Sequence, residues 1–145
     1  ANGERPPRSS QMGSRFTIAA YRSRMPVRLG LVAAEYNSSV TEPMQERARE
    51  AAAERGAEVA AEVTVPGSYD APLAADRLAR REQIDAVAVV GAVVTGDTDH
   101  DQVIGHAVAG RLTDVSLNRD TPVTFGVSGP GMSRRANGSI RERKR

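Results

Sequence analysis

The chain contains no cysteine and no tryptophan, and Lys144 is its only lysine. Without cysteine the protein can form neither disulfides nor thiolate metal sites, and it cannot use a cysteine nucleophile. None of its apolar runs approaches the roughly 20 residues needed to span a bilayer. The arginine-containing start of the chain also lacks the apolar segment of a secretory signal. We therefore expect a cytoplasmic protein without a membrane partner.

Charge is distributed unevenly along the 145 residues. Residues 1–24 hold five Arg and one Glu, and residues 134–145 hold five Arg, one Lys and one Glu. The segment between them holds nine Arg against sixteen acidic residues, so an acidic middle is flanked by basic ends. A small acidic domain without lysine is typical of proteins that stay soluble at high salt, where screening weakens self-repulsion.

The same boundaries divide the chain by sequence pattern. Residues 1–24 show no sustained period and are predicted to be a disordered tail or a leader. Met25 stands before the first clear strand as an initiator methionine would, so we expect the domain to span residues 25–133. Residues 134–145 are aperiodic, and Asn137-Gly138 favours a turn over a helix, which predicts a second basic tail.

Periodicity in the middle segment predicts strands that alternate with helices. The Ala- and Val-rich run over residues 84–94 is typical of a strand buried on both faces of a parallel sheet. Ser39 and Glu42 fit a capping box at the start of the first helix. Further strands are expected at 27–34, 58–65 and 121–127, and helices from Ser39 to a stop at Gly56, at 70–81 and at 100–117. This order predicts a flavodoxin-like α/β fold, a three-layer sandwich with a central parallel sheet.

The unusual residues of the chain follow the predicted strands, at the edge where ligands bind to such sheets. Residues 35–37, 66–70, 91–100 and 125–126 offer aromatic rings, hydroxyls, a carboxylate and the imidazole of His100. These groups suit a flat heteroaromatic substrate with a sugar-like side chain and a proton-transfer step. Each also has a plain structural alternative: Tyr36 as packing, Ser68 and Asp70 as a helix cap, and His100 as an exposed residue at a helix start.

Residues 91–98 nearly match the phosphate-binding P-loop pattern, but Asp97 stands where that pattern needs lysine. A carboxylate there would repel phosphates, which argues against a nucleoside triphosphatase. The helix that begins near Thr98 can still hold a phosphate monoester through its free N–H groups; alternatively, Asp97 and Thr98 only cap that helix. Neighbouring acidic residues at a helix start point in different directions, so no metal site is predicted.

Four motifs, in this order and at the family's spacing, resemble those of lumazine synthases. They are Tyr36-Asn37, Val65 to Pro72, Gly91 to His100, and Pro122 to Val127. The third motif, Gly-Ala-Val-Val-Thr-Gly-Asp-Thr-Asp-His, is the most specific of them. Because the domain is short and acidic, it is most similar to the versions found in salt-loving archaea.

The resemblance implies a transferase of riboflavin biosynthesis. Such an enzyme condenses 5-amino-6-ribitylamino-pyrimidinedione with 3,4-dihydroxy-2-butanone 4-phosphate into 6,7-dimethyl-8-ribityllumazine, and releases phosphate and water without a cofactor or a metal. The expected partners are these small molecules and further copies of the chain, because the family's sites lie between subunits of a pentamer, often within an icosahedral shell. Nucleic acid is not an expected partner.

The resemblance also implies the contacts to the pyrimidine substrate. Tyr36 would stack on the pyrimidine ring. Asn37, the second residue of the same motif, would also belong to the substrate-binding site. The ribityl chain would be held by Ser68, Tyr69 and Asp70. The ring edge would be met through the backbone groups of Ala92, Val93 and Val94.

The remaining implied roles concern the phosphate and the proton. Asp97 and Thr98 would seat the phosphate, and His100 would carry protons during imine formation and phosphate loss. Phe125 would enter the site of a neighbouring subunit. The family's last helix presents an arginine to the phosphate of the adjacent site, but here the basic tail 134–145 replaces that helix, so no arginine is assigned the role.

Two alternatives stay open. The archaeal type of riboflavin synthase shares the fold and the Pro66-Gly67 segment but lacks the Gly-Asp-Thr-x-His element. A catalytically impaired, cage-forming subunit would instead use its basic tails to neutralise nucleic-acid phosphates. The tail 134–145 has no interleaved aromatic residues on which bases could stack, which argues against this second alternative.

Overall fold

Four parallel strands form the centre of the fold. The structure, a computed structural model, describes residues 26–132. The predicted tails lie outside these residues, as do Met25 and Ser133. The elements are β1 (Arg28–Ala34), α2 (Ser38–Glu54), β2 (Glu58–Val65), the 3-10 turn η2 (Ser68–Asp70), α3 (Ala71–Ala79), β3 (Ala86–Ala92), α4 (His100–Arg119) and β4 (Val123–Ser128).

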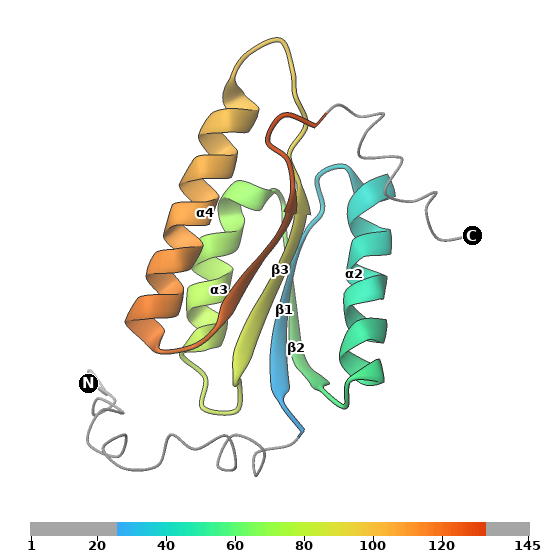
Figure 1. Ribbon diagram of the computed structural model, residues 1–145, viewed down its shortest axis with the longest axis vertical. Helices are drawn as coiled ribbons and strands as arrows, with labels where there is room; N and C mark the ends of the chain where they lie inside the picture. Colours follow the sequence, from blue (N-terminus) through green and yellow to red (C-terminus); the bar gives the residue numbers. More distant parts are fainter. Residues whose placement is uncertain (1–25, 133–145) are drawn as a thin grey trace.

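The strands pair in the order β2-β1-β3-β4, and every pair is parallel. Helices α3 and α4 cover one face of the sheet, and α2 covers the other (Figure 1). The predicted three-layer α/β sandwich is therefore confirmed. Because all strands run the same way, the segments after β1, β2, β3 and β4 leave the sheet at one edge.

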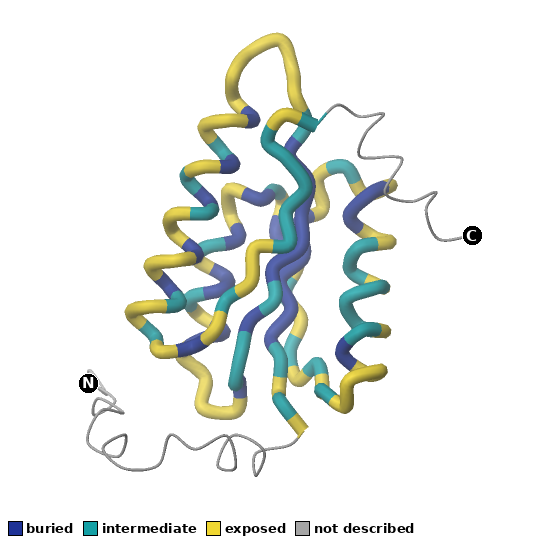
Figure 2. Tube along the Cα trace, in the orientation of Figure 1, coloured by how far each residue is buried: buried dark blue, intermediate teal, exposed yellow. Residues whose placement is uncertain are grey.

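The core lies around β1 and β3, the two central strands, which form the most deeply buried part of the trace (Figure 2). Alternate side chains of these strands point to opposite faces. On one face Val32 and Val89 pack with Leu78 of α3 and Leu112 of α4. On the other face Leu31, Ala33 and Val90 pack against the half-buried Met44 and Ala48 of α2. Burial of each large side chain stabilises the fold by about 1.5 to 3 kcal/mol.

The start of α2 differs from the predicted capping box. Asn37 is the N-cap, at φ 60°, and its backbone carbonyl accepts hydrogen bonds from the amides of Val40 and Thr41 at 2.9 and 3.1 Å. Ser39 lies inside the helix, and its hydroxyl donates to the Asn37 side chain at 3.4 Å. The capping box of Ser39 and Glu42 is therefore wrong. Asparagine takes this place because it adopts the left-handed conformation more readily than most residues.

An ion pair joins α3 and α4, the two helices on the face of the sheet opposite α2. Arg119 of α4 donates to both carboxylate oxygens of Asp76 of α3, at 2.7 and 3.3 Å, and Arg80 approaches Asp76 at 2.6 Å. The Asp76 side chain is only 18% exposed. The hydrogen bond from Arg119 is the main cause that lowers the pKa of Asp76, so this carboxylate stays ionised well into the acid range.

We expect the free energy of unfolding of Asp76→Asn to change less with pH in the acid range than that of the original protein. A carboxylate whose pKa is lowered by folding contributes its full stabilisation above the unfolded pKa of about 4, and loses it as pH falls through the lower folded pKa. Urea unfolding should show the variant about 1 kcal/mol less stable at pH 7, with a smaller deficit at pH 2. Asp114→Asn, which removes an exposed pair with Arg111, is the control. A deficit that is the same at both pH values would contradict this account.

Candidate active site

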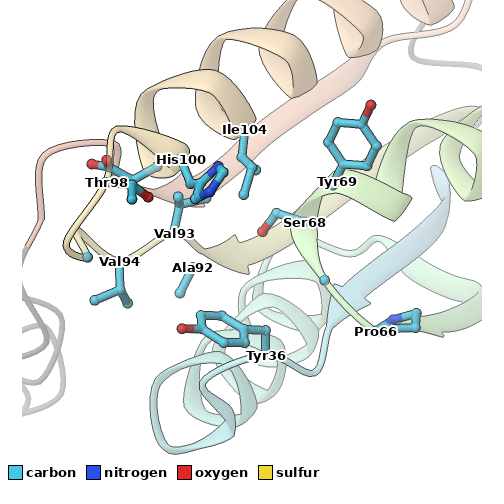
Figure 3. A pocket seen from close by; sticks show the side chains of 13 residues that line it. Tyr36, Pro66, Ser68, Tyr69, Ala92, Val93, Val94, Thr98, His100 and Ile104 are labelled. Carbon is cyan, nitrogen blue, oxygen red and sulfur yellow. The ribbon is translucent and has the colours of Figure 1, made fainter.

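A cavity of about 500 Å³ opens at the carboxyl edge of the sheet, between the segments that follow β1, β2 and β3 and the first turns of α4 (Figure 3). Its wall brings together residues from four separate parts of the chain. They are Tyr36, Pro66, Gly67, Ser68, Tyr69, Ala92, Val93, Val94, Gly96, Thr98, His100, Asp101 and Ile104. Eight of the twelve site residues predicted from the sequence are among them; Asn37, Asp70, Asp97 and Phe125 are not.

Tyr36 forms the wall of the cavity on the α2 side, opposite His100 and Ile104 of α4 (Figure 3). The amide of Tyr36 donates to the carbonyl of Pro66 at 3.0 Å, which continues the pairing of β1 with β2 beyond the end of the sheet. The backbone is thus fixed while the side chain remains 52% exposed. An exposed aromatic ring on a fixed backbone offers a face on which a flat substrate can stack.

Ser68 lies in the cavity wall beside β3. The residue is only 4% exposed, and its hydroxyl has no hydrogen-bond partner among the described residues. Gly91 makes room for it, because a Cβ at position 91 would lie 2.5 Å from the Ser68 Oγ. A buried hydroxyl without a partner is costly and is uncommon in folded proteins. It marks a place where a hydroxyl of a bound ligand can supply the missing hydrogen bond.

Asn37 and Asp70 have clear local functions. Asn37 caps α2, and a carboxylate oxygen of Asp70 accepts a hydrogen bond from the amide of Gly67 at 3.1 Å. The amide of Asp70 in turn donates to the carbonyl of Gly67 at 3.0 Å, so the two residues close the turn that presents Ser68 and Tyr69. The contacts predicted between Asn37 or Asp70 and a substrate stay predictions.

The N-terminus of α4 borders the cavity through Thr98 and His100. Asp99 is its N-cap, and no side chain caps this end, so neither Asp97 nor Thr98 serves as the cap. The first amides of a helix have no partner within the helix, and they favour a negatively charged ligand. The segment from Thr95 to His100 is exposed, and of the predicted pair Asp97 and Thr98 only Thr98 reaches the cavity wall.

The described wall of the cavity contains no lysine or arginine. A bound phosphate would therefore be met, on the part of this chain that the structure describes, by backbone amides, the Thr98 hydroxyl and the His100 imidazole. Within residues 26–132 no three His, Asp or Glu side chains gather closely enough to hold a metal ion. The acidic residues around His100 therefore form no metal-binding cluster.

No helix of the described residues is long and apolar enough to cross a membrane.

Phe125 lies on the edge strand β4, opposite Val89 in the register, and is 42% exposed. It is outside the cavity wall of its own chain. Conversely, the wall contains Asp101 and Ile104, which sequence reasoning missed as site residues. In the sequence Ile104 reads as an ordinary apolar residue of its helix, and Asp101 as a solvated acid at a helix start.

These features define a class of protein: an α/β protein whose cavity, at the carboxyl edge of a parallel sheet, suits a small aromatic and anionic ligand. Known proteins narrow the class. The sequence model of the family 6,7-dimethyl-8-ribityllumazine synthase matches residues 26–144. A protein of that name from Halorubrum lacusprofundi is 73% identical over 107 residues, which cover 74% of this chain and 80% of the relative.

Two further relatives carry the same name. The one from Halobacterium salinarum is 74% identical over 106 residues, covering 73% of this chain and 80% of its own. The one from Methanococcus aeolicus is 48% identical over 108 residues, covering 74% and 79%. The chain belongs to the 6,7-dimethyl-8-ribityllumazine synthase family. The predicted resemblance to archaeal, salt-loving members is thereby confirmed.

We expect Ser68→Ala to raise the stability of the ligand-free protein by about 1 kcal/mol, because it removes a buried hydroxyl that has no partner within residues 26–132. The free energy of unfolding in urea measures the change. Ser39→Ala, at an exposed position of α2, is the control for loss of a hydroxyl. A clear loss of stability in Ser68→Ala would show that the hydroxyl is already satisfied in solution.

Proposed function

We propose that this protein is a 6,7-dimethyl-8-ribityllumazine synthase, a transferase of riboflavin biosynthesis. It condenses 5-amino-6-ribitylamino-pyrimidinedione with 3,4-dihydroxy-2-butanone 4-phosphate. The observation that carries the proposal is the cavity itself. One wall offers the ring face of Tyr36, and another offers the Ser68 hydroxyl, which has no partner in the part of the chain that the structure describes. A third offers the imidazole of His100 at a helix N-terminus.

The pyrimidine substrate fits the half of the cavity nearest the sheet. Tyr36 supports one ring face, and the peptide groups of Ala92, Val93 and Val94 meet the ring edge. Ser68 and Tyr69 bind the ribityl hydroxyls, and Asp70 and Asn37 add contacts to the same substrate. The buried position of Ser68 supports this assignment, since a polyol chain both donates and accepts hydrogen bonds.

The butanone phosphate fits the half nearest α4. The free amides at the start of α4 and the Thr98 hydroxyl receive its phosphate, and Asp97 shapes the loop at the same place. His100 follows directly, so its imidazole can act where the carbon chain of the same substrate lies. It takes up and returns protons while the primary amine attacks the ketone, water leaves to form an imine, and phosphate is eliminated; the ribitylamino nitrogen then attacks the remaining carbonyl and closes the second ring with loss of a second water.

The reaction needs no metal or cofactor on this account. Condensation and elimination move protons but leave the overall oxidation level of the combined substrates unchanged, so an acid-base group is sufficient. A cytoplasmic location and the domain boundaries at residues 25 and 133 belong to the same proposal. The family match favours neither riboflavin synthase nor an impaired nucleic-acid cage.

Assembly completes the proposed site. Phe125 is exposed on the edge strand and lies away from the cavity of its own chain, as a residue that enters a neighbouring site would. We expect a homopentamer or a shell built from pentamers. Sedimentation velocity of the purified chain tests this, and a monomer as the only species at micromolar concentration would contradict it.

The direct test is turnover of the two purified substrates. We expect formation of fluorescent 6,7-dimethyl-8-ribityllumazine together with inorganic phosphate, and the same rate after treatment with a chelator. Absence of product from protein that is folded and assembled would contradict the proposed function. A rate that falls with the chelator and returns with a divalent cation would contradict the metal-free mechanism.

His100→Ala should lower turnover by about a hundredfold while substrate binding changes little, because proton transfer contributes to the chemical step and not to the ground-state complex. His106→Ala is the matched control. His106 lies on the same helix but is exposed and outside the cavity wall, so its loss should leave the rate unchanged. Equal rates in both variants would remove His100 from the mechanism.

A further inference from the structure

Asp101 is a buried carboxylate in the wall of the cavity, one residue after His100. It is 4% exposed, although most acidic side chains of the described residues lie at the surface. Its position in the first turn of α4 favours a negative charge, because the free amides there carry partial positive charge. Burial of a charged group is stable only when hydrogen bonds replace water, so its partners define what it does.

One carboxylate oxygen of Asp101 accepts two hydrogen bonds from segments outside its helix. The Thr95 hydroxyl donates to it at 3.2 Å, and the Gly131 amide donates to it at 2.9 Å. The bond from Gly131 is the main cause that lowers the pKa of Asp101, so the carboxylate is ionised at neutral pH. Asp101 therefore joins α4 to the loop after β3 and to the segment after β4.

The two segments that meet at Asp101 are also paired with each other. The amide of Val93 donates to the carbonyl of Ser128 at 2.8 Å, and the amide of Thr95 donates to the carbonyl of Met132 at 3.1 Å. The segment after β4 thus runs beside the loop and continues the pairing of β3 with β4. The loop leads directly to Thr98, and its position is therefore tied to that of residues 128–132.

Helix α4 accepts the segment closely. A Cβ at Gly105 would lie 2.6 Å from the Cδ of Pro130, so only glycine allows Pro130 to pack against the helix. This contact lies one turn after Asp101 on the same helix. Hydrogen bonds to Asp101 and contact at Gly105 hold the same segment at two successive turns.

We propose that Asp101 is a positioning residue, which fixes the loop after β3 and the first turn of α4 relative to each other. As a result, the phosphate-binding amides and His100 face the same cavity. The inference rests on the proposed function and adds to it a group that acts through its neighbours. Asp101 contacts no reacting atom in this account; its negative charge is directed to Thr95 and Gly131.

The experiment compares Asp101→Asn, Asp101→Ala and Thr95→Val in steady-state lumazine formation. Asn can place its carbonyl oxygen where both hydrogen bonds end, whereas Ala removes both and Val at position 95 removes one. We expect kcat/KM for the butanone phosphate to fall about tenfold in Thr95→Val and about a hundredfold in Asp101→Ala. Asp101→Asn should keep most of the original kcat/KM, because it can accept both hydrogen bonds. The KM for the pyrimidine substrate should change less than threefold, because that substrate contacts other walls.

Thr113→Val and Asp114→Asn are the matched controls on exposed positions of α4, and both should retain the original kinetics. Thr95 is itself exposed, so its variant tests the proposal even if Asp101→Ala does not fold. Unchanged kinetics in Thr95→Val and Asp101→Ala would overturn the proposal, as would a lower KM for the phosphate substrate, which would indicate that the charge merely repels it. A parallel loss for both substrates would show a structural role only. Absence of turnover in the original protein would instead contradict the proposed function.

Discussion

Parallel pairing of β1 with β3 sets Ala33 opposite Val90, and the segments that form the cavity leave the sheet just beyond that level. The pairing requires the intervening chain to cross back over the sheet, and the crossovers place α2 on one face and α3 with α4 on the other. Each crossover then delivers a different wall. The ring face comes from the segment after β1, the hydroxyl from the segment after β2, and the imidazole from the start of α4. Chemistry that is scattered over 65 residues of sequence becomes local for this reason.

The fold was readable from the sequence because burial on both faces leaves a strong pattern. The Ala and Val run at 84–94 contains β3, although the strand itself is shorter, at Ala86–Ala92. The carboxyl edge was readable as well, since aromatic and polar residues interrupt the apolar pattern there. Because Tyr36, Ser68 and His100 each follow a predicted strand, the sequence placed them at one edge of the sheet, where the structure has the cavity. The local sequence pattern was sufficient to predict a residue's surroundings wherever these depended on the strand or helix that contains the residue.

Local pattern failed where the environment depended on distant chain. Ser39 and Glu42 have the composition of a capping box, yet Asn37 is the N-cap of α2. Asn37 has a left-handed backbone, and its carbonyl accepts the first hydrogen bonds of the helix. Asp101 is followed by a polar residue and preceded by two more acidic or basic ones, so it reads as solvated. Its partners lie 6 and 30 residues away. Nothing in a window around position 101 shows that the segment after β4 will cover it.

The segment after β4 and the loop after β3 can separate only when several hydrogen bonds break together. The amides of Val93, Thr95 and Gly131 all donate across the same boundary, to Ser128, Met132 and Asp101. Groups that separate together also exchange their hydrogens with solvent together, as one cooperative unit. The three amides should therefore share a single protection factor, distinct from that of the sheet beneath them. Local unfolding at this contact is then a separation of residues 128–132 from the loop after β3 and from α4 together, and a ligand that binds only the paired form stabilises it by mass action.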